Sequence, residues 1–86
     1  MPKVEIYTTP ICPYCARAKK LLDRKGVAYQ EIDVMMDREK RREMTERAEG
    51  RTSVPQIFID DRPIGGCDDL FELDFDDQLD PLLGVA

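Results

Sequence analysis

Hydrophobic and polar residues alternate at the start of the chain in the way that predicts a β-strand. Over residues 3–8, Val4, Ile6 and Thr8 fall on one side and the residues between them fall on the other. This period of two is typical of a strand. Residues 28–34 alternate less regularly, but they end in a β-rich stretch, and we interpret them as a second strand.

The residues between these two strands have the period of a helix. Pro13 suits a first helical turn because its missing N–H would be unpaired there. Gly26 is expected to end this helix, because glycine commonly follows the last helical residue. Between them, one predicted face is small and apolar, and it consists of Cys15, Ala18, Leu21 and Leu22. Strand, helix and strand in this order predict a βαβ unit.

The rest of the chain continues this alternation of helices and strands. Residues 37–49 are so highly charged that only Met44 and Ala48 form an apolar stripe, so we expect an exposed helix that covers the sheet thinly. A strand, a turn, a return strand, a helix and a final apolar turn are predicted at residues 56–60, 61–62, 63–65, 68–75 and 79–83. The order β-α-β-α-β-β-α predicts an α/β fold in a single domain, residues 1–86.

Composition and charge narrow the range of possible functions. With 42% hydrophobic and 36% charged residues, the chain can build a core and coat it. The net charge of −5 argues against a nucleic-acid partner. Residues 1–51 hold 12 Lys and Arg against 9 Asp and Glu, whereas residues 52–86 hold one Arg against 9 acids. The simplest interpretation of this split is ordinary solvated surface.

The amino-terminal sequence has no signal-peptide pattern, and no run of residues reaches the length of a membrane span. We therefore expect a cytoplasmic protein without a membrane partner. Histidine is absent and cysteine occurs three times. Triads that need an imidazole are excluded, and the odd number of cysteines argues against a secreted scaffold held by paired disulfides.

The chief chemical signal is Cys12-Pro13-Tyr14-Cys15 at the junction of a strand and a helix. A cysteine at the N-cap lies beside unpaired backbone N–H groups and the positive end of the helix dipole, both of which stabilise a thiolate. Cys12 is therefore the candidate nucleophile. Cys15 follows one turn later and is more enclosed, so it is placed to resolve a mixed disulfide.

Metal binding is the main alternative for this pair. A zinc site usually needs four ligands, and only Cys67 remains once the pair is counted. An iron–sulfur cluster within one chain fails for the same reason, whereas a cluster shared between two chains stays open. We expect no metal.

Two further motifs each allow two interpretations. The Val54–Pro55 bond either ends a loop or is cis, which would turn the Val54 backbone outward to pair with an extended peptide. The segment from Gly65 to Asp69 is either a flexible turn with a capping acid or a helix N-terminus able to hold a carboxylate. Cys67 within it is more typical of a small buried residue than of a catalyst.

Three segments in register give the sequence a family resemblance. Cys12-Pro13-Tyr14-Cys15, residues 52–59 (TSVPQIFI) and residues 64–70 (IGGCDDL) occur in the order and spacing of small bacterial dithiol glutaredoxins. The chain resembles this family over essentially its whole length and is nearest to the glutaredoxin 3 type. The resemblance implies a thioredoxin fold, in which helices flank a four-stranded mixed sheet.

The resemblance also implies an activity and a site. It predicts a glutathione-dependent thiol–disulfide oxidoreductase, active as a monomer, with Cys12 as nucleophile and Cys15 as resolving thiol. Its clients would be glutathionylated or disulfide-containing proteins, among which ribonucleotide reductase is a candidate. The residues that the resemblance assigns to glutathione are Tyr14, Thr52, Val54, Pro55, Gly66, Cys67 and Asp68.

The sequence departs from the family at one position and leaves two rival functions open. Many relatives have a lysine where this chain has Thr9, so Arg41 or Arg51 is a candidate to replace that charge. One rival is an iron–sulfur carrier or sensor in a glutathione-bridged dimer, which Pro13 disfavours because such relatives have less rigid residues there. The other is a thioredoxin-like reductant fed by a reductase, which the segment after Gly65 disfavours.

Overall fold

The computed structural model describes residues 2–85. In chain order its elements are β1 (Val4–Thr8), α1 (Pro13–Arg24), β2 (Gln30–Asp33), α2 (Arg38–Arg47), β3 (Gln56–Ile59), β4 (Arg62–Gly65), α3 (Cys67–Phe75) and α4 (Leu79–Leu83). The strands form a sheet in the order β2-β1-β3-β4, in which β1 is parallel to β2 and the other neighbours are antiparallel. The predicted four-stranded mixed sheet flanked by helices is confirmed.

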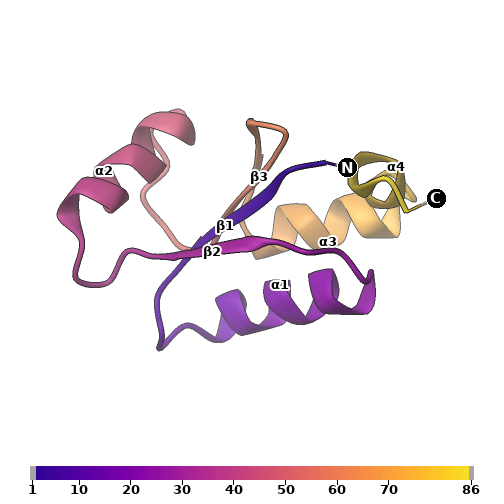
Figure 1. Cartoon of the computed structure of the whole chain (residues 1–86), viewed down its shortest axis with the longest axis horizontal. Helices are drawn as coiled ribbons and strands as arrows, with labels where there is room; N and C mark the ends of the chain where they lie inside the picture. Colours follow the sequence, from indigo (N-terminus) through magenta and orange to yellow (C-terminus); the bar gives the residue numbers. More distant parts are fainter. Residues whose placement is uncertain (1, 86) are drawn as a thin grey trace.

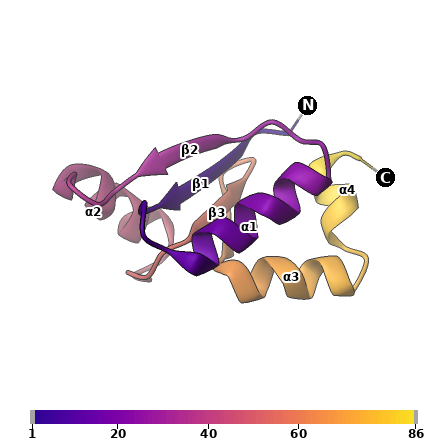
Figure 2. The same ribbon diagram turned by 90° about the horizontal axis from the view of Figure 1, so that it is seen from below.

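Helices cover both faces of this sheet (Figures 1 and 2). On one face, α1, α3 and α4 bury a large core against the aliphatic side chains of β1 and β3, which are Val4, Ile6, Ile57 and Ile59. On the other face, α2 buries a smaller cluster that contains Tyr7, Val34, Met44, Ala48 and Phe58. The two faces therefore differ: an aliphatic core lies under three helices, and an aromatic one lies under a single helix.

The alternation predicted for β1 is present, but both of its sides are buried. Val4 and Ile6 face the larger core, while Glu5 and Tyr7 face α2, and each of these side chains is less than a tenth exposed. A polar side chain buried in this way needs a partner, because desolvation without a hydrogen bond is costly. Because β1 lies between β2 and β3, its buried Glu5 and Tyr7 side chains need hydrogen-bond partners from α2.

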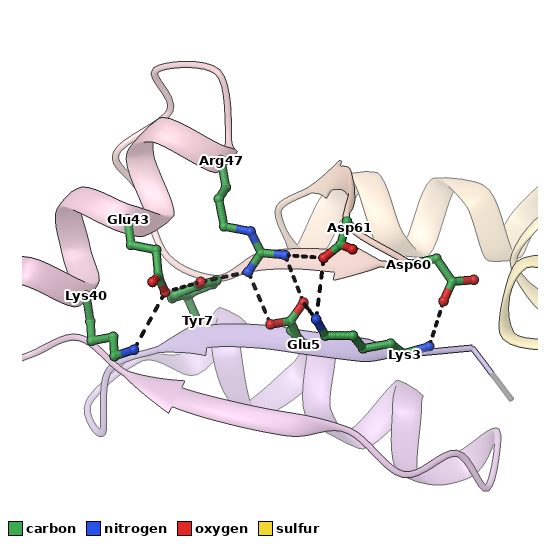
Figure 3. A network of polar contacts seen from close by, with 8 residues as sticks. All are labelled: Lys3, Glu5, Tyr7, Lys40, Glu43, Arg47, Asp60 and Asp61. Atoms are coloured by element: carbon green, nitrogen blue, oxygen red, sulfur yellow. Dashed lines mark hydrogen bonds and ion pairs between the residues drawn. The ribbon is translucent and has the colours of Figure 1, made fainter.

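Arg47 of α2 meets this requirement (Figure 3). Its guanidinium donates to both carboxylate oxygens of Glu5, at 2.8 and 3.2 Å, and to the Tyr7 hydroxyl at 2.7 Å. It also lies 4.2 Å from the centre of the Phe58 ring, a cation–π geometry. The Tyr7 hydroxyl in turn donates to Glu43 at 2.7 Å. Burial and this carboxylate raise the pKa of Tyr7, so the hydroxyl stays a donor.

The same network reaches the turn between β3 and β4 (Figure 3). Asp61 pairs with Arg47 at 3.2 Å and with Lys3 at 3.5 Å, and Asp60 accepts from the backbone N–H of Lys3 at 2.8 Å. The thin apolar stripe of α2 is therefore supplemented by polar contacts that attach the helix to β1 and to this turn.

Element boundaries differ from the prediction in small ways. The hairpin turn is at Asp60 and Asp61, not at 61–62, and both residues have positive φ, as a two-residue type I′ turn requires. Asp residues tolerate that conformation better than most. The predicted final apolar turn is a short helix, α4, whose Leu79 and Leu83 are buried. Within residues 2–85, no helix is both long and apolar enough to cross a membrane.

Replacing Arg47 with Met should lower the free energy of unfolding by about 2 kcal/mol, because the buried Glu5 carboxylate loses its partner. This value is below that for a fully buried pair, since a quarter of the Arg47 side chain is exposed. Urea unfolding measures the change. Arg42→Met, on the exposed side of α2, is the matched control. In the double variant with Glu5→Gln, part of the loss should return; a double variant less stable than Arg47→Met alone would contradict this assignment.

Candidate active site

Cys12 occupies the N-cap of α1, as predicted. Its backbone is extended, with φ −143°, and its Sγ accepts a hydrogen bond from the Cys15 N–H at 3.0 Å. Pro13 takes the first helical position, where no N–H is needed. The sulfur therefore receives both a backbone donor and the positive end of the helix dipole, the arrangement that stabilises a thiolate once the thiol is free.

The structure shows this pair in its oxidised form, as a Cys12–Cys15 disulfide with the Cα atoms 5.2 Å apart. Cys12 is partly exposed, whereas Cys15 is almost completely buried, with 1% of its surface accessible. A substrate can therefore reach the Cys12 sulfur but not that of Cys15. This asymmetry fits an attacking thiol and a resolving thiol.

The Val54–Pro55 bond is cis, which decides between the two interpretations of that motif. The Val54 carbonyl oxygen lies 3.9 Å from the Cys12 Sγ, so the two segments meet although 42 residues separate them. Pro55 is buried and Val54 is partly exposed. The Val54 backbone thus lies beside the reactive sulfur, where an extended peptide bound at Cys12 would pass.

The N-terminus of α3 lies across from this segment (Figure 2). Gly66 is its N-cap, and Asp69 accepts the Gly66 N–H at 2.8 Å and pairs with Arg51 at 3.0 Å. Gly65 has φ +114°, and a Cβ there would collide with the Asp69 carboxylate and Arg51, so the close approach requires glycine. Asp68 is exposed. The two acidic residues therefore differ in role: Asp69 stabilises the turn before α3, and the exposed Asp68 carboxylate is available to bind a ligand.

A groove of about 240 Å³ joins these segments. Of the residues predicted for glutathione, six line it, and they are Tyr14, Val54, Pro55, Gly66, Cys67 and Asp68. Arg51, Ser53 and Asp69 line it as well. The last three were not among the predicted contacts, although Asp69 stands three residues after the cap, the spacing at which a carboxylate reaches back to the first N–H of a helix.

Thr52 is not brought into this groove. It is exposed, and its carbonyl oxygen accepts a hydrogen bond from Arg41 at 3.2 Å on the neighbouring surface, which Arg38 and Arg42 also line. The chain turns between Thr52 and Val54, so these two residues face different surfaces. Of the two arginines considered as substitutes for the family lysine, Arg51 lies in the groove and Arg41 lies outside it.

Cys67 differs chemically from the other two cysteines. Its thiol is free but only 6% exposed, and burial raises its pKa. The nearby Arg17 partly offsets this effect. A thiol kept protonated is a poor nucleophile. Cys67 therefore contributes its backbone and its volume to the groove wall, as expected for a small buried residue.

An N-cap cysteine bonded to a second cysteine one turn later, beside a cis-proline on a mixed sheet, defines a class of protein: the thiol–disulfide oxidoreductases with the thioredoxin fold. Comparison with known proteins narrows the class. The family model described as Glutaredoxin matches residues 4–64. The chain belongs to the glutaredoxin family.

Individual relatives cover nearly the whole chain. Glutaredoxin 3 of Escherichia coli strain K12 is 59% identical over 83 residues, which span 96% of this chain and 99% of that protein. The crystal structure of a buckwheat glutaredoxin–glutathione complex superposes with a TM-score of 0.87 at 31% identity, over 96% of this chain and 77% of that one. The solution structure of a glutaredoxin from Brucella melitensis gives 0.83 at 54% identity, over 96% and 89%.

Asp69→Asn should make the protein less stable near neutral pH by about 1 kcal/mol, as expected for a capping contact weakened by solvent. The Gly66 N–H and Arg51 lower the pKa of Asp69. A carboxyl group whose pKa is lower in the folded chain stabilises above its unfolded pKa of about 4, and this contribution disappears as the pH falls through the folded value. Urea unfolding at pH 7 and pH 3 should therefore show a smaller gap in stability between wild type and variant at pH 3 than at pH 7. An equal gap at both values would rule out this role for the carboxylate.

Proposed function

We propose that the protein uses glutathione to reduce glutathionyl mixed disulfides and protein disulfides. The observation that carries the proposal is the position of the Cys12 sulfur, which lies at a helix N-terminus and 3.9 Å from the carbonyl of Val54, a residue that lines the groove leading to the N-terminus of α3. A similar solved structure is a complex of a glutaredoxin with glutathione. The groove offers chemistry that suits each part of this tripeptide.

The cysteinyl part of glutathione has an extended backbone, and Val54 offers backbone groups for it to pair with. The γ-glutamyl end has an amine and a carboxylate. The amine suits the exposed Asp68 carboxylate, and the carboxylate suits the first N–H groups of α3, at Cys67 and Asp68. Tyr14, which is half-exposed, lines the same groove. Glutathione bound in this way directs its own sulfur toward Cys12.

The reaction is thiol–disulfide exchange. The Cys12 thiolate attacks the glutathionyl sulfur of a mixed disulfide, a new S–S bond forms, and the client leaves as a thiolate that takes up a proton. A second glutathione, as thiolate, attacks this intermediate, frees Cys12 and leaves as oxidised glutathione. With a client disulfide, Cys12 forms the mixed disulfide with the client and Cys15 displaces it, which closes the bond seen in the structure.

Cys15→Ser should retain turnover of a glutathionylated peptide and lose most reduction of a protein disulfide, because only the second route needs the resolving thiol. Cys12→Ser should abolish both. Steady-state assays with and without glutathione measure the two activities, and Met36→Ser, at an exposed position outside the groove, is the control. Equal loss of both activities in Cys15→Ser would contradict this division of tasks, and no turnover by wild type with glutathione present would overturn the proposed function.

Asp68→Asn should raise the KM for glutathione about tenfold, the effect of one lost charge-assisted hydrogen bond, and leave kcat nearly unchanged. The carboxylate meets the bound amine in both ground and transition states, so its loss weakens binding uniformly. Initial rates at varied glutathione concentrations separate the two constants. Asp60→Asn, at the far end of β3, is the control. A fall in kcat at unchanged KM would place Asp68 elsewhere in the mechanism.

A further inference from the structure

A second and larger groove runs along α3 on the side away from α1. It has a volume of about 620 Å³ and lies between the edge strand β4, α3 and α4. In both views α4 lies at the opposite end of the molecule from α2, beside the C-terminal end of α3 (Figures 1 and 2). Its lining is Arg62, Pro63, Ile64, Asp69, Glu72, Leu73, Asp76, Asp77, Gln78, Pro81 and Leu82. None of the steps proposed above uses this groove.

The groove has an apolar floor and an acidic rim. Ile64, Leu73 and Leu82 are partly buried and pack on the main core, which leaves part of each side chain open to the groove. The lining contains four carboxylates and one cation, Arg62. Of these carboxylates, only Asp69 has an ion-pair partner within residues 2–85. A cationic ligand with an aliphatic part complements such a surface.

The acids lie where they do not benefit their own helix. Glu72 and Asp76 stand at the C-terminal end of α3, whose last turn has no basic residue. The helix dipole is negative there, so carboxylates at this end are unfavourable by a few tenths of a kcal/mol each. Lys25 pairs with Asp74 and Asp80 at this end of the helix, but in the described part of the chain it pairs with neither Glu72 nor Asp76. The dipole and these two carboxylates therefore still add to one another and attract cations.

The acidic groove and the proposed glutathione groove share one lining residue, Asp69. From Asp69 to Asp76 the helix rises about 10 Å, at 1.5 Å per residue. An extended peptide spans this distance in about three residues. A client segment that reaches Asp69 therefore needs only about three further residues to run along the acidic groove to Asp76.

We propose that this groove docks a basic segment of the client protein, with Lys or Arg residues on either side of an aliphatic one. The proposal rests on the function proposed above and adds a class of client to it. Pro63 lies in the edge strand β4 and has no N–H, so it disfavours addition of the client as a fifth strand. Recognition is therefore through side chains, with the aliphatic residue on the floor and the cations at the rim.

The test uses two glutathionylated peptides with one cysteine each. One has Lys-Leu-Arg four residues from the cysteine, and the other has Glu-Leu-Glu at the same place. At low salt, wild type should show a KM about tenfold lower for the basic peptide, and 0.5 M salt should remove most of the difference. In Glu72→Gln/Asp76→Asn/Asp77→Asn, the preference should disappear.

Two controls make the result specific. Glu39→Gln/Glu46→Gln/Glu49→Gln removes the same charge from α2 and its end, and it should keep the preference. Glutathionylated cysteine, which is too small to reach the acidic groove, should be turned over equally by all three proteins. Equal KM values for the two peptides in wild type, or equal loss of preference in both triple variants, would overturn the docking proposal. No turnover of the small substrate would instead overturn the proposed function.

Discussion

The register of three antiparallel strands brings the site together. Tyr7 of β1 pairs with Gln56 of β3, and Ile57 of β3 pairs with Gly65 of β4. The end of β1, the start of β3 and the end of β4 therefore lie side by side at one edge of the sheet. The segments that continue from them must meet there: one leads to Cys12, one arrives through Pro55 and one leads into α3. A shift of β3 by one residue would turn its side chains to the opposite faces and separate these segments.

This register depends on both faces of the sheet being covered. The aliphatic face forms a core in the usual way, but the other face carries Glu5 and Tyr7 in the middle of a central strand. Arg47 satisfies both while its guanidinium lies over Phe58. The same helix then leads into the segment that carries Val54. The contacts that attach α2 to the sheet therefore also help to place the cis-proline segment, although they lie away from the Cys12 sulfur.

The sequence predicted what depends on local pattern. Periodicity and breakers located the strands and helices, and the pair Cys12 and Cys15 indicated both the chemistry and the end of the helix where it occurs. What could not be predicted depends on contacts between distant segments. Nothing near Glu5 in the sequence indicates that Arg47 is its partner. The spacing of Asp69 from Gly66 could have indicated their hydrogen bond, but nothing near Asp69 indicates its ion pair with Arg51. The family resemblance assigned Thr52 to glutathione, but the chain turns between Thr52 and Val54, and the two residues face different surfaces.

This chain has no histidine, and helix ends supply the positive potential at the site instead. The N-terminus of α1 stabilises the sulfur, and the N-terminus of α3 offers N–H groups to a carboxylate, so one groove has two positive dipole ends. The C-terminal end of α3 is negative, and it carries acidic residues that the helix dipole disfavours at this position. A single nine-residue helix thus presents opposite potentials at its two ends. An anionic tripeptide is attracted to one end and repelled by the other, whereas a basic client has the reverse preference. Under the two proposals above, two ligands of opposite charge therefore bind to different surfaces and do not compete for one.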